Sequence, residues 1–396
     1  MKSAEESIQS KSQKPIYRDA NLQIIFCVTL ISVIGFVSIT PAFPKIVEEL
    51  NISTQDVGLL ISVFTFPGII LTLFLGVLAD RIGRKKIIIP SLMLFGIAGV
   101  ACTFARDFNL LLILRFFQGI GVAPLMLLSI TIIGDLYSGK ERATAMGYNI
   151  SILNVGAASF PSIGGALAML GWYYPFILPI AAIPVGLLVL FSLKNPEPKK
   201  EQHLREYLSD AWQSIKNLQV VGLFIVSTVT FLILFGSFLT YFPLLIGDSF
   251  GASPFIIGLI ISSMSLTAAF TSSQLGKLTK VYPERNLIKA AFILYPLALI
   301  IIPSVPNLWL LLIPTIIFGI AHGINEPSFH TLLSGLAPMR HRAAFISVNQ
   351  TVVRLGQTSG PLLMGVIFGV WGISGVFYIG AAFSIVMFAL AIVMLK

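Results

Sequence analysis

Long apolar stretches separated by short polar segments run through almost the whole chain. A helix that crosses a bilayer needs about 20 mostly apolar residues, and this pattern therefore predicts an all-α membrane protein. The connections between the apolar stretches are short, with one exception near the middle of the chain. Twelve transmembrane helices are predicted, at 22–44, 56–79, 87–105, 109–134, 143–169, 173–193, 218–246, 255–276, 287–304, 308–334, 343–369 and 373–395.

The composition agrees with a membrane location and argues against an enzyme. Of the 396 residues, 56% are hydrophobic and only 11% are charged, whereas soluble proteins carry about 25% charged residues. No soluble segment is large enough to host catalysis, and the sequence lacks a GxxxxGK[ST] phosphate loop and the HExxH, CxxC and GxSxG patterns. We therefore expect no catalytic residues and no cofactor. Both cysteines lie within apolar stretches and predict neither a disulfide nor a metal site.

The one long polar connection divides the chain into two equivalent halves. A shift of 200 positions places Gly58 on Gly258, and Gly156 and Pro161 on Gly356 and Pro361. Six spans separate equivalent positions, so the halves are parallel pseudo-repeats related by an axis along the membrane normal. The predicted domains are a tail at 1–20, a six-helix bundle at 21–193, a linker at 194–217 and a second six-helix bundle at 218–396.

The distribution of the basic residues predicts the orientation of the chain. With both termini in the cytoplasm, 22 of the 26 Lys and Arg residues fall on the cytoplasmic side, as the positive-inside rule requires. The net charge of +9 therefore reflects membrane topology, and no nucleic-acid partner is expected. We expect a multi-pass protein of a bacterial or archaeal inner membrane that is a monomer and contacts membrane lipids.

The loop between the second and third predicted spans reads GVLADRIGRKK. Asp80 lies at the end of a helix, where the macrodipole disfavours a negative charge, so it needs a cation or a facing helix N-terminus. The start of span eleven, near Ala343, is such an N-terminus, and a contact there would form only when the halves close on the cytoplasmic side. We predict a conformational latch, against the alternative of a solvated basic turn that only sets topology. Its residues are Gly76, Asp80, Arg81, Gly83 and Arg84.

This loop resembles motif A of the major facilitator superfamily, G-x-L-x-D-R-x-G-R-K-x, nearly in full. LLILRFFQGIG, with Arg115, is similar to motif B. GAASFPSIGG is similar to the antiporter motif C, although Phe160 stands where a glycine is usual. The resemblance covers the whole chain and extends to the twelve-span drug:proton antiporters. It implies the major facilitator fold, alternating access and proton-coupled export of small lipophilic compounds, and it implies that Arg115 influences proton handling.

Predicted span ten carries the clearest candidates for proton coupling. His322, Glu326 and His330 are spaced four apart and so share one helix face. Burial disfavours the charged form of a carboxyl group, so Glu326 is suited to exchange a proton when water reaches it. Arg354 in span eleven lies at similar depth, and we predict that Glu326 alternates between a proton and Arg354. The alternative is a structural ion pair. A metal site is not expected, because the two histidines are about 12 Å apart along the helix.

Further residues are predicted to pack helices, to act as hinges or to bind substrate. Small residues and prolines in spans five and eleven allow close helix approach or a kink, and they are Gly156, Pro161, Gly164, Gly165, Gly356 and Pro361. By resemblance, spans one, two and seven line a cavity, and polar groups on neighbouring spans could add contacts. The candidate cavity residues are Phe36, Phe64, Asn149, Asn154, Phe231, Phe235, Tyr241, Asn325, Gln350 and Gln357.

These observations favour a secondary active transporter that exports lipophilic or amphipathic small molecules against protons by alternating access. Three alternatives remain. An exporter of one endogenous metabolite, such as a sugar or siderophore, would show saturable flux for one compound. A proton-coupled importer would accumulate its substrate under an inward proton gradient. A membrane receptor would show no flux.

Overall fold

The computed structural model describes residues 16–194, 217–336 and 342–395. Most of the predicted tail at 1–20 and of the predicted linker at 194–217 therefore lies outside the described residues. The first half begins with a short 3-10 helix, η1. The elements of this half are η1 (Ile16–Arg18), α2 (Ala20–Val37), η2 (Thr40–Ala42), α3 (Phe43–Glu49), η3 (Asp56–Gly58), α4 (Leu59–Ile82), α5 (Arg84–Phe104), α6 (Phe108–Val122), α7 (Leu125–Leu136), α8 (Gly139–Leu170), η4 (Tyr174–Ala181) and α9 (Ala182–Ser192).

The second half repeats this helical arrangement. Its elements are α11 (Leu218–Ile233), the π-helical η5 (Leu234–Tyr241), α12 (Phe242–Phe250), α13 (Pro254–Ser273), α14 (Leu275–Leu278), α15 (Glu284–Ile301), η6 (Ile302–Ser304), η7 (Leu308–Leu311), α16 (Leu312–Leu336) and α17 (Arg342–Met394).

The described residues contain enough long apolar helices for twelve membrane crossings. Ten helices are individually long and apolar enough, and the bent segment Asp56–Ile82 supplies an eleventh. The 53 residues of α17 would measure about 80 Å as one straight helix, far more than the ~30 Å hydrocarbon core. Gly372 interrupts α17 with a positive φ of 65° and divides it into two crossings. The predicted all-α fold with twelve spans is confirmed.

Polar residues at the ends of the apolar segments fix where several helices begin. Asp19 accepts a hydrogen bond from the amide of Asn21 at the start of α2, at 2.8 Å. Asp107 accepts one from the amide of Leu110 in α6, at 2.9 Å. Asn217 caps α11 in the same way. These side chains satisfy amides that have no partner within the helix, so short polar loops are enough to separate the spans.

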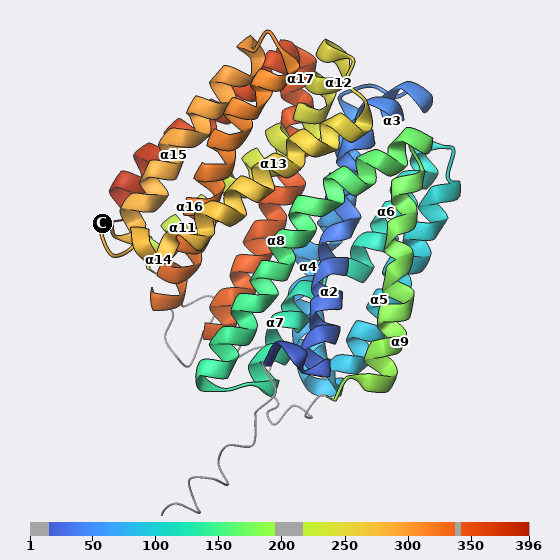
Figure 1. Cartoon of the computed structure of the whole chain (residues 1–396), viewed down its shortest axis with the longest axis vertical. Helices are drawn as coiled ribbons and strands as arrows, with labels where there is room; N and C mark the ends of the chain where they lie inside the picture. The colour runs from blue at the N-terminus through green and yellow to red at the C-terminus, as the bar shows by residue number, and fades with distance from the viewer. Residues whose placement is uncertain (1–15, 195–216, 337–341, 396) are drawn as a thin grey trace, which may run out of the picture.

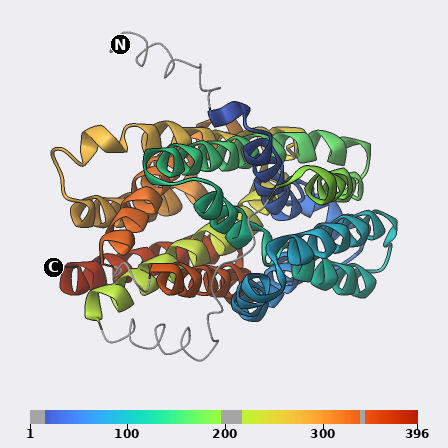
Figure 2. The ribbon, with the colours of Figure 1, turned by 90° about the horizontal axis from the view of Figure 1, so that it is seen from below.

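The two halves lie side by side, with α8 and α13 against each other (Figure 1). A second extensive contact joins α4 to α17. Seen from below, most blue-to-cyan helices lie on the right and most orange-to-red helices on the left, while green and yellow helices cross the middle (Figure 2). We call the end that carries the turns around Gly83, Ser138 and Pro283 the basic end, and the end that carries the turns around Ile52, Ala105 and Gly372 the opposite end.

The halves join through an apolar core at the opposite end. One buried cluster contains first-half residues such as Phe43 and Val57 together with second-half residues such as Leu244 and Ile257. A second buried cluster consists of first-half residues only. In Figure 1, α8 and α13 are close at their upper ends and diverge downwards, away from this shared cluster. The structure is therefore sealed at the opposite end.

Span seven contains a π-helical segment that the sequence did not lead us to expect. The hydroxyl of Thr240 donates to the carbonyl oxygen of Phe235, five residues earlier, at 2.6 Å. Gly236, inside this segment, allows close contact with α17, because a Cβ there would lie 2.8 Å from the carbonyl oxygen of Gly360. Single π-helical turns are frequent at functional sites. Here the wide turn lies where span seven packs against α17.

Candidate functional site

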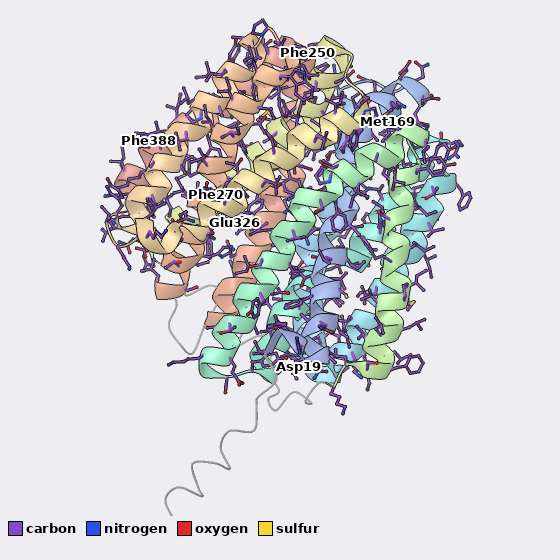
Figure 3. The ribbon with its side chains drawn as sticks, viewed as in Figure 1. Asp19, Met169, Phe250, Phe270, Glu326 and Phe388 are labelled. Carbon is purple, nitrogen blue, oxygen red and sulfur yellow. The ribbon has the colours of Figure 1, made fainter. Side chains whose placement is uncertain are left out.

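The candidate coupling residues of α16 form a hydrogen-bonded group with α15. The Nε2 atom of His322 lies 3.2 Å from Oε2 of Glu326, the residue one helical turn later. The other ring nitrogen of His322, Nδ1, lies 3.2 Å from the hydroxyl oxygen of Tyr295 in α15. Figure 3 shows Glu326 within the second half of the molecule. The structure therefore joins two residues predicted from the sequence to a third, Tyr295, that was not.

The neighbouring helices fix the rotation of α16 about its own axis. Asn325 donates through Nδ2 to the hydroxyl of Thr230 in α11, at 2.8 Å. On the other side, the hydroxyl of Ser272 in α13 donates to the carbonyl oxygen of Gly323, at 3.0 Å. These bonds leave the Glu326 carboxylate partly exposed, at 36% of its side-chain surface. The carboxylate is thus partly accessible, while the imidazole beside it stays largely buried.

Arg354 does not pair with Glu326 in this structure. Its Nη1 donates to Oε1 of Gln357 one turn later, at 3.0 Å. Its stem packs on Gly68 of α4, where a Cβ would lie 3.0 Å from the Arg354 Cδ and Nε atoms. Similar depth in the membrane is therefore not enough to bring the two charges together, because Arg354 lies against the other half. The alternation of Glu326 between a proton and Arg354 stays a prediction.

Arg115 is completely buried in the first half. Its Nε donates to the carbonyl oxygen of Leu60 at 3.1 Å, and its Nη1 donates to the carbonyl oxygen of Gly35 at 2.7 Å. Nη1 also donates to Oε1 of Gln118 at 2.6 Å, and the guanidinium lies 4.0 Å from the ring centre of Phe64. Arg115 thus ties α2, α4 and α6 together. No described residue within 4 Å offers it a carboxylate, and its influence on proton handling stays a prediction.

The motif A residues form a charge cluster at the basic end. Arg84 is only 6% exposed and lies between two carboxylates, with 3.1 Å to Asp80 and 2.7 Å to Asp135 at the end of α7. Gly83 ends α4 with a positive φ of 101°. Gly76 allows close approach of α7, since a Cβ there would lie 2.9 Å from Cδ2 of Leu127. Asp135 escaped the sequence analysis, although it directly follows the predicted span 109–134.

The proposed partner of this latch lies outside the described side chains. Near Ala343 the structure gives the backbone of α17 only. Arg81 is exposed beside the cluster. The latch between the halves therefore stays a prediction, whereas the Asp80–Arg84–Asp135 cluster within the first half is a finding.

The predicted packing and hinge residues lie where helices approach most closely. A Cβ on Gly165 would collide with the carbonyl oxygen of Pro254, and one on Gly164 with that of Ser38. Gly356 makes a similar approach to the carbonyl of Thr228 in α11. Gly156 contacts Leu30, and Pro161 and Pro361 lie against Gly258 and Gly58 of the opposite half. This arrangement accounts for packing, and a hinge role stays a prediction.

Three of the candidate cavity aromatics come together where the halves meet. The rings of Phe36 and Phe235 are 5.1 Å apart, and those of Phe231 and Phe235 are 6.2 Å apart. Phe64 and Tyr241 lie elsewhere. Phe64 is fully buried under Arg115, and Tyr241 is fully buried with its hydroxyl donating to the carbonyl oxygen of Gln55 at 3.3 Å. In this structure neither has a surface to offer a ligand.

The candidate polar cavity residues divide in the same way. Asn149 is buried and accepts a hydrogen bond from Thr29 in α2, at 2.7 Å. Asn325 and Gln357 are also buried and hold Thr230 and Arg354. Asn154 and Gln350 are half-buried. Several of these amides therefore hold helices together here, and their contact with a substrate stays a prediction.

Comparison with known proteins places the chain in a family. The family model of the Major Facilitator Superfamily matches residues 25–253 and 228–396. Multidrug resistance protein 1 of Bacillus subtilis (strain 168) is 25% identical over 357 residues, which cover 89% of this chain and 91% of that protein. Quinolone resistance protein NorA of Staphylococcus aureus (strain COL) is 25% identical over 347 residues, covering 85% of this chain and 87% of NorA.

Solved structures agree on the fold. A bacterial homologue of the human lysosomal transporter Spinster, in an inward-facing and occupied conformation, has a TM-score of 0.79 at 19% identity and covers 96% of this chain and 97% of its own. The nucleoside transporter NupG has a TM-score of 0.75 at 15% identity, covering 96% and 99%. With the twelve crossings and the two joined halves, these matches show that the chain belongs to the Major Facilitator Superfamily and is a multi-pass membrane transporter, not an enzyme.

Proposed function

We propose that this transporter exports lipophilic or amphipathic small molecules in exchange for protons. The names of its relatives, multidrug resistance protein and quinolone resistance protein, support drug efflux as the general activity. The observation that supports proton coupling is the Glu326–His322 pair in α16, in which a titratable carboxylate lies within a membrane span and is partly exposed.

The way the halves meet supports alternating access as part of this proposal. Across the seam, which is the contact between the two halves, the hydroxyl of Ser62 donates to the carbonyl oxygen of Thr358 at 2.8 Å. Ser162 and Ser262 share a second hydrogen bond of 2.8 Å across it. These bonds lie towards the opposite end, beside the shared apolar cluster. Rocking of two like-oriented halves would break these contacts and open that end. The equivalent rocking would close the basic end.

The orientation is part of the proposal. The basic end carries most of the Lys and Arg residues, so the positive-inside rule places it in the cytoplasm of a bacterial or archaeal cell, together with both termini. With this orientation the sealed opposite end faces outwards, which supports a state that is open towards the cytoplasm. In that state an exporter takes up its substrate, and Glu326 would release its proton to the cytoplasm. We further propose that the transporter works as a monomer.

The test is transport by purified protein in proteoliposomes with an imposed pH gradient. A panel of a lipophilic cation, a neutral lipophilic compound and a sugar is assayed with the native chain and with Glu326→Gln. We expect uphill movement of lipophilic compounds against protons, and loss of uphill movement in the variant. Uphill movement by Glu326→Gln with unchanged pH dependence would refute the coupling role.

The other functions give different results in the same assay. Flux restricted to the sugar would favour the metabolite exporter. Movement of the compound together with protons would favour the importer. The absence of any flux in functional proteoliposomes would favour the receptor and end the proposal.

A further inference from the structure

The hydroxyl of Tyr295 is held in place by the apolar packing around its ring. The residue is 1% exposed. Its ring lies 5.5 Å from that of Phe292 in the same helix and 4.9 Å from that of Phe318 in α16. The hydroxyl oxygen is thereby fixed 3.2 Å from Nδ1 of His322. A tyrosine in this apolar setting needs a hydrogen-bond partner for its hydroxyl, and His322 supplies one.

The hydrogen bonds of His322 determine which of its ring nitrogens carries the hydrogen. A neutral imidazole has one N–H donor and one acceptor nitrogen. An ionised Glu326 can only accept, so the hydrogen lies on Nε2 and points at Oε2 of Glu326. Nδ1 is then the acceptor, and the hydroxyl of Tyr295 donates to it. With a neutral ring and an ionised Glu326, this is the one arrangement in which both bonds form.

We propose that Tyr295 is a positioning residue for proton coupling, acting through His322. This inference rests on the proposed exchange of protons at Glu326. The bond from Nε2 to Glu326 weakens when the carboxylate takes up a proton, because charge-assisted hydrogen bonds are about twice as strong as neutral ones. The bond from Tyr295 does not involve the carboxylate. It therefore holds the imidazole in the same place whether Glu326 is charged or neutral.

The other groups around Tyr295, His322 and Glu326 are compatible with this role. Among the described residues, α16 itself adds His330, one turn after Glu326, and Asn325, whose side-chain amide also interacts with the hydroxyl of Tyr295. The short helix α14, which packs on α16, carries Lys277. From α11 comes the ring of Phe231, 6.4 Å from that of His322, and from α13 comes the hydroxyl of Ser272, which is engaged with a backbone carbonyl. Neither residue is charged. Tyr295 is thus the titratable side chain that α15 places against His322.

The experiment combines nitrogen-15 NMR of histidine-labelled protein with transport of a fluorescent lipophilic cation in proteoliposomes. Subtraction of the spectrum of His322→Gln assigns the His322 signals. We expect the native protein at alkaline pH to show one neutral tautomer with the hydrogen on Nε2. The hydrogen on Nδ1, or an equal mixture of tautomers, would overturn the proposal even if Tyr295→Phe does not fold.

Tyr295→Phe keeps the ring and removes the hydroxyl, and Tyr378→Phe, at an exposed position, is the matched control. In Tyr295→Phe we expect the hydrogen to stay on Nε2 while Glu326 is ionised, and the midpoint of transport to shift by about 0.5 to 1 pH unit, the size expected for loss of one hydrogen bond. An unchanged midpoint would refute the role of Tyr295. If Glu326→Gln stays coupled, the proposed function fails instead, and the tautomer result still stands by itself.

Discussion

Gly258 of α13 lies against the backbone of Pro161 in α8, so closely that a Cβ on Gly258 would collide with the Pro161 carbonyl oxygen. The equivalent pair under the 200-residue shift, Gly58 and Pro361, also meets across the two halves. That contact is looser, because a Cβ on Gly58 would lie 3.0 Å from the Pro361 carbonyl oxygen. The seal at the opposite end thus contains two equivalent glycine–proline contacts, and the contact at Gly258 is the closer of the two.

The unequal contacts predict unequal effects of alanine. Gly258→Ala forces the backbones of α13 and α8 apart and should shift the population away from the state described here. Gly58→Ala should have a much smaller effect. Spin labels at Thr144 and Asn286, near the basic ends of α8 and α15, report the separation of the halves there. We expect a shorter label distance in Gly258→Ala than in the native protein. Label distances that stay the same as in the native protein in both variants would show that the glycine contacts do not control the seal.

The hydroxyl pair of Thr65 and Thr358, 2.8 Å apart across the seam, gives a second prediction. Valine at either position keeps the shape and removes the bond. A hydrogen bond contributes about 0.5–1.5 kcal/mol net, so each variant should lower the ratio of sealed to unsealed molecules by about 2- to 10-fold. A double-mutant cycle with Thr65→Val and Thr358→Val, read out by the same label distances, should show coupling between the two sites. Additive effects would mean that the pair contributes nothing to the seal.

Removal of the cation at the centre of the motif A cluster should destabilise the first half. Arg84→Gln leaves Asp80 and Asp135 facing each other without a cation, and we expect a loss on the order of 2 kcal/mol, the scale of hydrogen bonds to charged groups. Arg81→Gln, at the neighbouring exposed position, is the control. Thermal unfolding in detergent measures both variants. Restoration of the melting temperature by Asp135→Asn in the Arg84→Gln background would confirm the cause, and an unaltered melting temperature in Arg84→Gln would contradict it.

Arg115→Lys should be far from a conservative change. A lysine keeps the charge but cannot reach the carbonyl oxygens of Leu60 and Gly35 and the amide of Gln118 at the same time. A buried acceptor left unpaired costs about 1–3 kcal/mol, so the melting temperature should fall clearly. Arg142→Lys, on the exposed surface of α8, should leave it nearly unchanged. If the two variants melt alike, the contacts of Arg115 do not stabilise the first half.

The fold could be predicted from the sequence because the bilayer imposes it. Each span must be apolar and about 20 residues long, and the repeat gives the relation between the halves. Even the fused α17 was expected as two spans, since the apolar run is too long for one. The π-helical segment of span seven could not be predicted, because it depends on how Gly236 packs against Gly360.

The candidate site was only partly predictable, for a geometrical reason. Spacing by four placed His322 beside Glu326, because both are on one helix. Contacts between helices depend on the rotation of each helix about its axis, which a nearly uniform apolar sequence does not reveal. That is why Tyr295 and Asp135 were missed, and why Arg354 was expected at Glu326 but lies against Gly68.

The apolar cluster shared by both halves at the opposite end has a thermodynamic consequence. When the halves separate there, side chains such as Phe43 and Leu244 that are now fully buried become the walls of a water-filled opening. Hydration of apolar surface raises the heat capacity. The equilibrium between the two access states should therefore curve with temperature, and cooling should weaken the apolar contribution to the seal.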